Sequence, residues 1–302
     1  SPRVNIGSTN YLVQRDPQGR WGTLGVAGTT LNTGVLTMAV SPSGTLFFAG
    51  GFGSAGGTLA RDIAMYLPTT QRFGTLTGGT LNGAVNAIVF SPAGTLYIGG
   101  EFTTVAGTAK QRVAQWNGAY GTLTGGGGGT PNAAVQALYH TGGTLVLGGA
   151  FAILGGTAGA RGIGVWVNGN YGTMGPGSCS GDVYAITSDQ RQRIYFGGQF
   201  QSVNNVTAGS VAFWSADGFG TLGGGGVANG APTTIVEAMA VAQNAILYYG
   251  GRFGTAGGGS VANIAKFNGV QSFPLARGVG TANSQVRAIV PLIDGRLLVG
   301  GV

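Results

Sequence analysis

The chain repeats one unit of about fifty residues six times. In each copy a valine is followed by small and apolar residues, a turn, and a segment that ends in Gly-Gly-x-Phe or a close variant. Successive valines are 50, 50, 48, 53 and 50 residues apart, and joining the two chain ends would make the sixth interval 51. The sequence therefore predicts a closed ring of six equal units that is interrupted inside one of them. The six valines are Val35, Val85, Val135, Val183, Val236 and Val286.

A ring of this kind is typical of a β-propeller, and four strands can be assigned within each unit. The first two flank a turn such as residues 91–94, Ser-Pro-Ala-Gly, which places proline and glycine where a type I hairpin turn with a glycine bulge needs them. The third strand carries an aromatic residue such as Trp116, and the fourth begins with an aromatic residue such as Tyr120. We therefore expect an all-β, six-bladed β-propeller with four-stranded blades, forming one domain over residues 1–302.

The order of the hairpins predicts how the ring closes. A hairpin of the third and fourth strands, at about residues 10–24, precedes every first strand. The last hairpin of the first and second strands, residues 285–301, is followed by no further hairpin. We expect these two halves to pair in one blade, which would remove open sheet edges that otherwise favour aggregation.

The glycine pairs before the recurring phenylalanines predict a close approach of backbones. Glycine lacks a Cβ atom, so it permits a β-bulge or a tight contact with a neighbouring strand. We expect this contact where neighbouring blades converge. The phenylalanines are Phe52, Phe102, Phe151, Phe200 and Phe253.

The low charge of the chain limits its surroundings and its partners. Only 8% of the residues are charged, whereas a free soluble surface usually carries more. Either Ser, Thr, Asn, Gln and Gly cover a secreted domain, or other protein subunits of a large assembly cover much of the surface. The net charge of +7 suits acidic glycans or cell-surface polysaccharides. Nucleic acid is a poorer candidate, because the arginines are scattered and form no basic stripe.

Cysteine usage and the chain start bear on localisation. The single cysteine, Cys179, excludes an intrachain disulfide framework. No apolar run is long enough for a membrane span, and the first residues lack the apolar core of a signal peptide. A removed leader or a leaderless chain, as in virions, would explain that start. We expect an extracellular or virion localisation.

Two segments resemble the repeats of Kelch-like and Rax2-like extracellular propellers. They are residues 94–102, Gly-Thr-Leu-Tyr-Ile-Gly-Gly-Glu-Phe, and residues 117–123, Asn-Gly-Ala-Tyr-Gly-Thr-Leu. The resemblance covers essentially the whole chain and implies a propeller fold used for binding or surface display. This chain departs from the pattern by placing Gly-Thr after the fourth-strand aromatic residue and by retaining that strand's tryptophan in one unit only.

The residues that usually carry catalysis are few and scattered. His140 is the only histidine and stands where sister repeats have Val40 or Phe90, so we expect a packed side chain. Cys179 lies in a loop without a basic neighbour in the sequence, which favours an inert thiol. The acidic residues fall at unrelated repeat positions, and the glycine run 125–129 lacks the Lys-Ser/Thr of a phosphate-binding loop. We therefore predict no catalytic residue, no metal site and no cofactor.

Two repeat positions vary while their neighbours stay fixed, which makes them candidates for ligand binding. One is the second residue of the first strand, and the other is the residue before the recurring phenylalanine. Their side chains either satisfy each other and water at the mouth of the central channel, or form a ring that contacts a ligand. Glu237 and Arg287 share the first position in consecutive units, so we expect them to approach each other. The polar and aromatic candidates are Asn86, Gln136, Tyr184, Glu237 and Arg287 at the first position, and Glu101, Gln199 and Arg252 at the second.

Three arginines near the start of the third strand, Arg61, Arg112 and Arg161, are candidates for an anion-facing arc. The alternative is that they are solvated and cap the loop.

Together these features predict a non-catalytic structural or recognition module of an extracellular or virion-type assembly, such as a phage tail or fibre component. A secreted glycan-binding propeller is the alternative among binding proteins. A propeller hydrolase or lyase that uses carboxylates from opposite sides of the channel is the alternative among enzymes.

Overall fold

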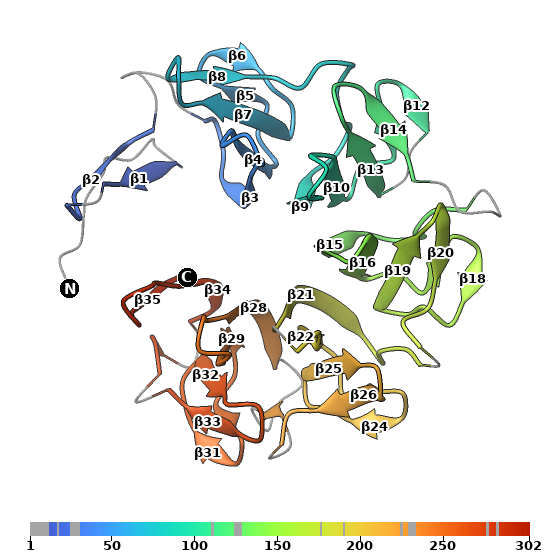
Figure 1. The fold of residues 1–302 in the computed structure, drawn as a ribbon, viewed down its shortest axis with the longest axis vertical. Helices are drawn as coiled ribbons and strands as arrows, with labels where there is room; N and C mark the ends of the chain where they lie inside the picture. The colour runs from blue at the N-terminus through green and yellow to red at the C-terminus, as the bar shows by residue number, and fades with distance from the viewer. Residues whose placement is uncertain are drawn as a thin grey trace. The chain divides into compact units, whose positions relative to one another are not determined.

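A computed structural model describes the chain as a succession of short β-strands, numbered β1 to β35 (Figure 1). All regular elements in the described part are strands, and none of it forms a helix long and apolar enough to cross a membrane. The described residues are 12–16, 18–24, 31–109, 112–123, 129–175, 177–189, 191–223, 226–228, 234–275, 278–281 and 284–302.

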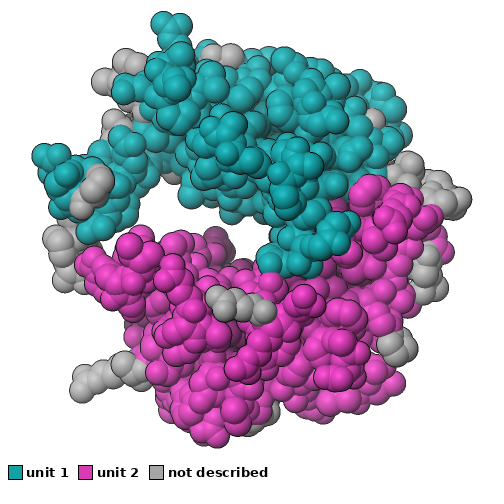
Figure 2. Space-filling model, viewed as in Figure 1, with its two compact units in different colours: residues 1–124, 130–143 teal, residues 125–129, 144–302 magenta. Residues whose placement is uncertain are grey.

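The chain divides into two compact units, which are described separately (Figure 2). The first comprises residues 1–124 and 130–143, and the second comprises residues 125–129 and 144–302. Strand β15 (Val135–Thr141) belongs to the first unit and β16 (Thr144–Gly149) to the second. This division does not test the prediction of a single domain.

The first unit contains two four-stranded antiparallel sheets whose strands follow one another in chain order. Their first strands, β3 and β9, lie side by side, and β15 lies beside β9. The sheets are β3 (Val35–Val40), β4 (Leu46–Gly50), β7 (Ile63–Leu67) and β8 (Arg72–Gly74), and β9 (Val85–Phe90), β10 (Leu96–Gly100), β13 (Val113–Trp116) and β14 (Tyr120–Thr122). The two-stranded sheets are β1 (Val13–Arg15) with β2 (Trp21–Thr23), β5 (Ser54–Ala55) with β6 (Thr58–Leu59), and β11 (Thr104–Val105) with β12 (Thr108–Ala109).

The second unit repeats this arrangement, with β21, β28 and β34 side by side. Its larger sheets contain β16, β19 (Ile163–Val167) and β20 (Asn170–Gly172); β21 (Asp182–Ser188), β22 (Ile194–Gln199), β25 (Val211–Ser215) and β26 (Gly218–Thr221); and β28 (Ile235–Val241), β29 (Leu247–Arg252), β32 (Ile264–Phe267) and β33 (Ser272–Pro274). Smaller sheets are β17 (Ile153–Leu154) with β18 (Thr157–Ala158), β23 (Ser202–Val203) with β24 (Val206–Thr207), β27 (Val227–Ala228) with β30 (Thr255–Ala256) and β31 (Gly259–Ser260), and β34 (Val286–Pro291) with β35 (Leu297–Gly301).

These four-stranded antiparallel sheets agree with the propeller-type blades that the sequence predicts. The predicted closing blade is not tested by these sheets. Strands β1 and β2 pair with each other in the first unit, and β34 and β35 pair with each other in the second. Residues 10 and 11 lie outside the described residues, and the pairing of the two hairpins stays a prediction.

In four repeats, the first glycine of the pair lies against the valine of the next sheet. A Cβ atom on Gly99 would lie 2.6 Å from Cγ1 of Val135, and one on Gly250 would lie 2.5 Å from Cγ1 of Val286. Gly148 faces Val183 and Gly197 faces Val236 in the same way. Since these four valines are almost completely buried, glycine is what lets consecutive sheets come together at this point.

The second glycine lies opposite a β-bulge in the first strand. In the pairing of β9 with β10, Val85 is opposite Gly100 and Ala87 is opposite Gly99, so Asn86 is the extra residue. The same shift occurs in β3, β21, β28 and β34. A Cβ atom on Gly198 would lie 1.9 Å from the carbonyl oxygen of Asp182, which excludes any side chain there. The glycine pair thus serves both the sheet contact and the bulge.

A residue with positive φ follows each recurring phenylalanine ten or eleven residues later. Its N–H donates to the carbonyl of that phenylalanine, and its own carbonyl accepts from the N–H of the second glycine, with N···O distances of 2.7 to 3.0 Å. The position holds Asp62, Arg112, Gly162, Ser210 and Asn263, with φ from 65° to 76°. Sequence reasoning missed it, because five residue types share one backbone conformation.

Aromatic rings fill the contact between consecutive sheets near the turn that joins the first and second strands. Phe47 of β4 meets Phe90 of β9 at a ring-centroid distance of 5.1 Å. Tyr97 of β10 stacks on His140 of β15 at 5.7 Å, with the ring planes 11° apart. His140 therefore occupies the place of Phe90 in the next repeat, as expected of a packed histidine, and partial burial lowers its pKa.

We predict that Gly50→Ala is far more damaging than Gly51→Ala. A Cβ atom on Gly50 would lie 2.4 Å from the carbonyl oxygen of Gly34, so backbone must move, at a cost of about 3 kcal/mol. A Cβ atom on Gly51 meets nothing within 4 Å, and the restricted unfolded chain favours folding by roughly 0.5 kcal/mol. Urea unfolding of both variants measures the difference. Equal midpoints would contradict this account of the glycine pair.

Candidate functional site

The extra residue of each bulge is the variable second residue of the first strand. It is Leu36 in β3, Asn86 in β9, Tyr184 in β21, Glu237 in β28 and Arg287 in β34. A bulge leaves this residue outside the regular pairing and redirects its side chain, which is why bulges often lie next to functional sites. The repeat therefore fixes the backbone at this position and leaves the side chain to vary.

In the second unit, Glu237 lies near Arg287, and its charge acts on Tyr184 of the neighbouring β21. The side chains of Glu237 and Arg287 are 3.7 Å apart between Oε2 and Nε, which confirms the predicted approach. Arg287 also donates from Nη2 to Oε1 of Gln285, at 3.2 Å. Tyr184 donates its hydroxyl proton to Oδ2 of Asp182, also at 3.2 Å. We call Tyr184, Glu237, Arg252 and Arg287 the bulge cluster.

Burial and the neighbouring arginines have opposite effects on the carboxylate of Glu237. Its Oε2 atom is buried and has no hydrogen-bond partner among the described residues, since the contact with Arg287 is too long for a hydrogen bond. Burial raises the pKa of Glu237, and the charges of Arg287 and Arg252 partly oppose that rise. Burial, with the neighbouring charges of Asp182 and Glu237, also raises the pKa of Tyr184 to about 12. At neutral pH, Tyr184 is therefore a hydrogen-bond donor.

The residues before the recurring phenylalanine lie at the same end of the strands. Gln199 is exposed and is opposite Asp182 in the pairing of β21 with β22. Arg252 is half-buried and is opposite Ile235 in the pairing of β28 with β29. Five of the eight predicted ligand-binding residues therefore belong to the second unit: Tyr184, Gln199, Glu237, Arg252 and Arg287.

The other three belong to the first unit. Asn86 donates from Nδ2 to the carbonyl oxygen of Val135 at 3.3 Å, so its side chain helps to join two neighbouring sheets. Gln136 is half-buried on β15, and Glu101 is exposed after β10. A ligand-binding role for these residues stays a prediction.

The three candidate arginines do not share one repeat position. Arg112 has the positive φ described above and donates from Nη1 to the carbonyl oxygen of Glu101 at 2.9 Å. Arg61 and Arg161 come one residue earlier in their repeats, and both are exposed. Sequence reasoning grouped them because spacing alone does not show which residue takes the left-handed conformation. Their anion-facing role stays a prediction.

Cys179 is buried and has the environment of an apolar residue. It forms an isolated β-bridge with Val203, where sister repeats form bridges from Leu31 and Leu81. Burial raises the pKa of its thiol to about 12, so the thiolate needed for reactivity is scarce at neutral pH. Within the described residues, no three His, Cys, Asp or Glu side chains are grouped so that they could hold a metal ion.

Comparison with solved structures gives the fold class of the chain. At 10% identity and a TM-score of 0.57, 97% of the chain aligns with the extracellular domain of BT4673 from B. thetaiotaomicron. Virginiamycin B lyase from Staphylococcus aureus aligns over 93% of the chain, at 12% identity and a TM-score of 0.52. PorZ, a surface component of the type-IX secretion system of Porphyromonas gingivalis, aligns over 92%, at 15% identity and a TM-score of 0.53.

These similarities support a propeller-type, all-β fold. The chain spans 38% of the length of the BT4673 and PorZ chains and 82% of the lyase. No family model and no curated protein matches the sequence. The narrower resemblance to Kelch-like and Rax2-like proteins stays a prediction.

We predict that Arg287→Gln raises the pKa of Glu237, because it removes one of the two cations that oppose the effect of burial. The carboxyl ¹³C shift of Glu237, followed by NMR against pH, measures this change. The folded pKa of Glu237 lies above the unfolded value of 4.5. Ionisation of Glu237 therefore lowers the free energy of unfolding as the pH rises through the folded pKa. Glu237→Gln should remove this loss of stability.

Arg296→Gln is the matched control for this titration. Arg296 pairs with Asp294 in the turn between β34 and β35 and lowers the pKa of Asp294. The control should raise the pKa of Asp294 and leave that of Glu237 unchanged. An unchanged Glu237 titration in Arg287→Gln would show that the pair does not interact in solution.

Proposed function

We propose that the chain is a non-catalytic recognition module that works outside the cell and binds a polar ligand through its bulge cluster. The observation that carries this proposal is that Glu237 of β28 lies near Arg287 of β34 and acts electrostatically on Tyr184 of β21, all three at one repeat position. The repeat fold does not need these side chains, since the same position holds Leu36 and Asn86 elsewhere. The cluster offers donors, acceptors and an aromatic ring together, which suits the hydroxyl groups of a glycan.

The extracellular setting draws support from the kind of proteins that share the fold. One similar structure is named as an extracellular domain and another as a bacterial surface component. The virion-type version, a phage tail or fibre component held by neighbouring subunits, rests on the low charge of the chain.

We further infer six blades and a closed ring. Val35 is only half-buried, although the other five anchor valines are almost completely buried. Beside it on β3, Met38 is 58% exposed and Val40 is 62% exposed. On β35, a Cβ atom on Gly300 would meet, among the described residues, only Cβ of Ala288 at 3.8 Å. The incomplete burial of Val35 and the open space beside Gly300 support a sixth contact of the same kind.

A propeller lyase or hydrolase is the second candidate, and one similar structure is a lyase. The half-buried Glu237, with its raised pKa beside Arg287, would be the proton-transfer group of such an enzyme. The two functions differ in what Glu237→Gln does. It would abolish turnover with little loss of binding in the enzyme, and weaken binding itself in the recognition module.

We predict that Glu237→Gln and Arg287→Gln each weaken binding to acidic bacterial polysaccharides at least about tenfold, because each removes a charged hydrogen-bonding group. A polysaccharide array identifies the ligand, and titration of the strongest hit measures the loss. Arg296→Gln, which lies in an exposed turn, should bind like wild type. Wild-type affinity in both cluster variants would contradict the assignment of the site.

A further inference from the structure

The contact between the last two sheets of the second unit lacks a ring that two contacts of the first unit have. Tyr248 of β29 stands at the repeat position of Phe47 and Tyr97. The residue that should face it, at the position of Phe90 and His140, is Pro291 of β34. An open pocket lies beside Pro291, at the position where Phe90 and His140 place a ring in the first unit. The equivalent residues Ser188 and Val241 of the second unit are not aromatic either.

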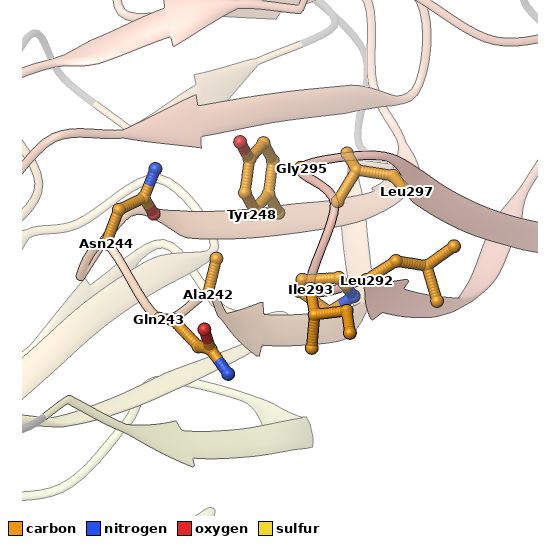
Figure 3. A pocket seen from close by; sticks show the side chains of 9 residues that line it. Ala242, Gln243, Asn244, Tyr248, Leu292, Ile293, Gly295 and Leu297 are labelled. Atoms are coloured by element: carbon orange, nitrogen blue, oxygen red, sulfur yellow. The ribbon is translucent and has the colours of Figure 1, made fainter.

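This space is a cavity of about 230 Å³, large enough for one aromatic ring system. Figure 3 shows Tyr248 beside it, with the turn that carries Gln243 and Asn244 on one side and the turn that carries Leu292 and Ile293 on the other. The Oδ1 atom of Asn244 accepts a hydrogen bond from the N–H of Ile246 at 3.2 Å, a bond that does not use its Nδ2 donors. The lining residues are Ala242, Gln243, Asn244, Tyr248, Pro291, Leu292, Ile293, Gly295 and Leu297.

We propose that this cavity binds a planar aromatic ring with a polar substituent, a phenol or an indole. The ring would stack on Tyr248 as His140 stacks on Tyr97, while Leu292 and Leu297 provide apolar walls. The exposed amides of Gln243 and Asn244 both donate and accept, so they would bind the hydroxyl or N–H group of the ligand. The ligand would take the place that the rings of Phe90 and His140 have in the first unit.

The cavity is distinct from the bulge cluster. The cluster lies at the start of β28 and β34, and the cavity lies at their ends, after Val241 and Pro291. A strand of six residues is about 20 Å long, so the two sites are at opposite ends of the same strands.

The proposed ring closure would not add an aromatic side chain here. In the first unit, Trp116 contributes a third ring at 6.0 Å from Phe47, and Trp116 is opposite Tyr120 in its hairpin. The residue opposite the corresponding Trp21 is Arg15. The sixth blade would thus bring an arginine to the repeat position of Trp116.

The test is a titration of the whole chain with p-cresol and with indole, followed by methyl and amide NMR. We expect saturable shifts at Gln243, Asn244, Leu292 and Leu297. Pro291→Phe should fill the cavity with its own ring and abolish these shifts. His140→Phe, the same kind of change at the equivalent position of another repeat, should leave them unchanged.

A free aromatic compound and an aromatic side chain of a protein share this chemistry. Acetyl-Gly-Tyr-Gly-amide distinguishes them: equal or tighter binding than p-cresol assigns the cavity to a protein side chain, and weaker binding assigns it to a free compound. Binding that survives in a folded Pro291→Phe variant, or no saturable shift with either probe, would overturn the proposal. Thermal unfolding of Pro291→Phe shows whether that variant is folded.

Discussion

The contact between a glycine of one sheet and a valine of the next holds the repeated sheets together. A Cβ atom on Gly197 would lie 2.5 Å from Cγ1 of Val236, so there is no room for a side chain at this spacing. Ala49 is the one residue other than glycine at this position in the described sheets. The following glycine, Gly198, lies against the carbonyl of Asp182 and maintains the bulge. One dipeptide thus sets both the spacing between sheets and the shape of the strand that faces the next contact.

This division of tasks explains why the fold and the candidate sites are separate. The bulge frees one side chain for each repeat, and the cluster of Tyr184, Glu237 and Arg287 is built from such residues. At the other end of the strands, the residue at the position of Phe90 varies, and it is an aromatic ring in only some of the contacts. Beside Pro291, which holds this position in β34, lies an open pocket, and the contact between Gly250 and Val286 is retained.

The sequence predicts what depends on spacing and on residue size. It predicts the strand order, the close approach at the glycine pairs and the meeting of Glu237 with Arg287, because equal repeat positions become neighbours in consecutive sheets. It does not show that Arg112 takes a left-handed conformation, since backbone hydrogen bonds impose that φ on whatever residue is present. The cavity beside Tyr248 also escapes prediction, because the two turns that line it, one with Gln243 and one with Leu292, are about fifty residues apart in the sequence.

The central proposal, a ring of six blades closed by a sixth sheet-to-sheet contact, is open to a direct test. The most direct measurement is the distance between spin labels at Ser43 and Asp294, two exposed turn positions, compared with labels at Ser43 and Ala93 on neighbouring sheets of the first unit. Cys179 is buried and does not compete for the label. A closed ring predicts two narrow and similar distance distributions. A longer or much broader distribution for Ser43 and Asp294 would contradict closure.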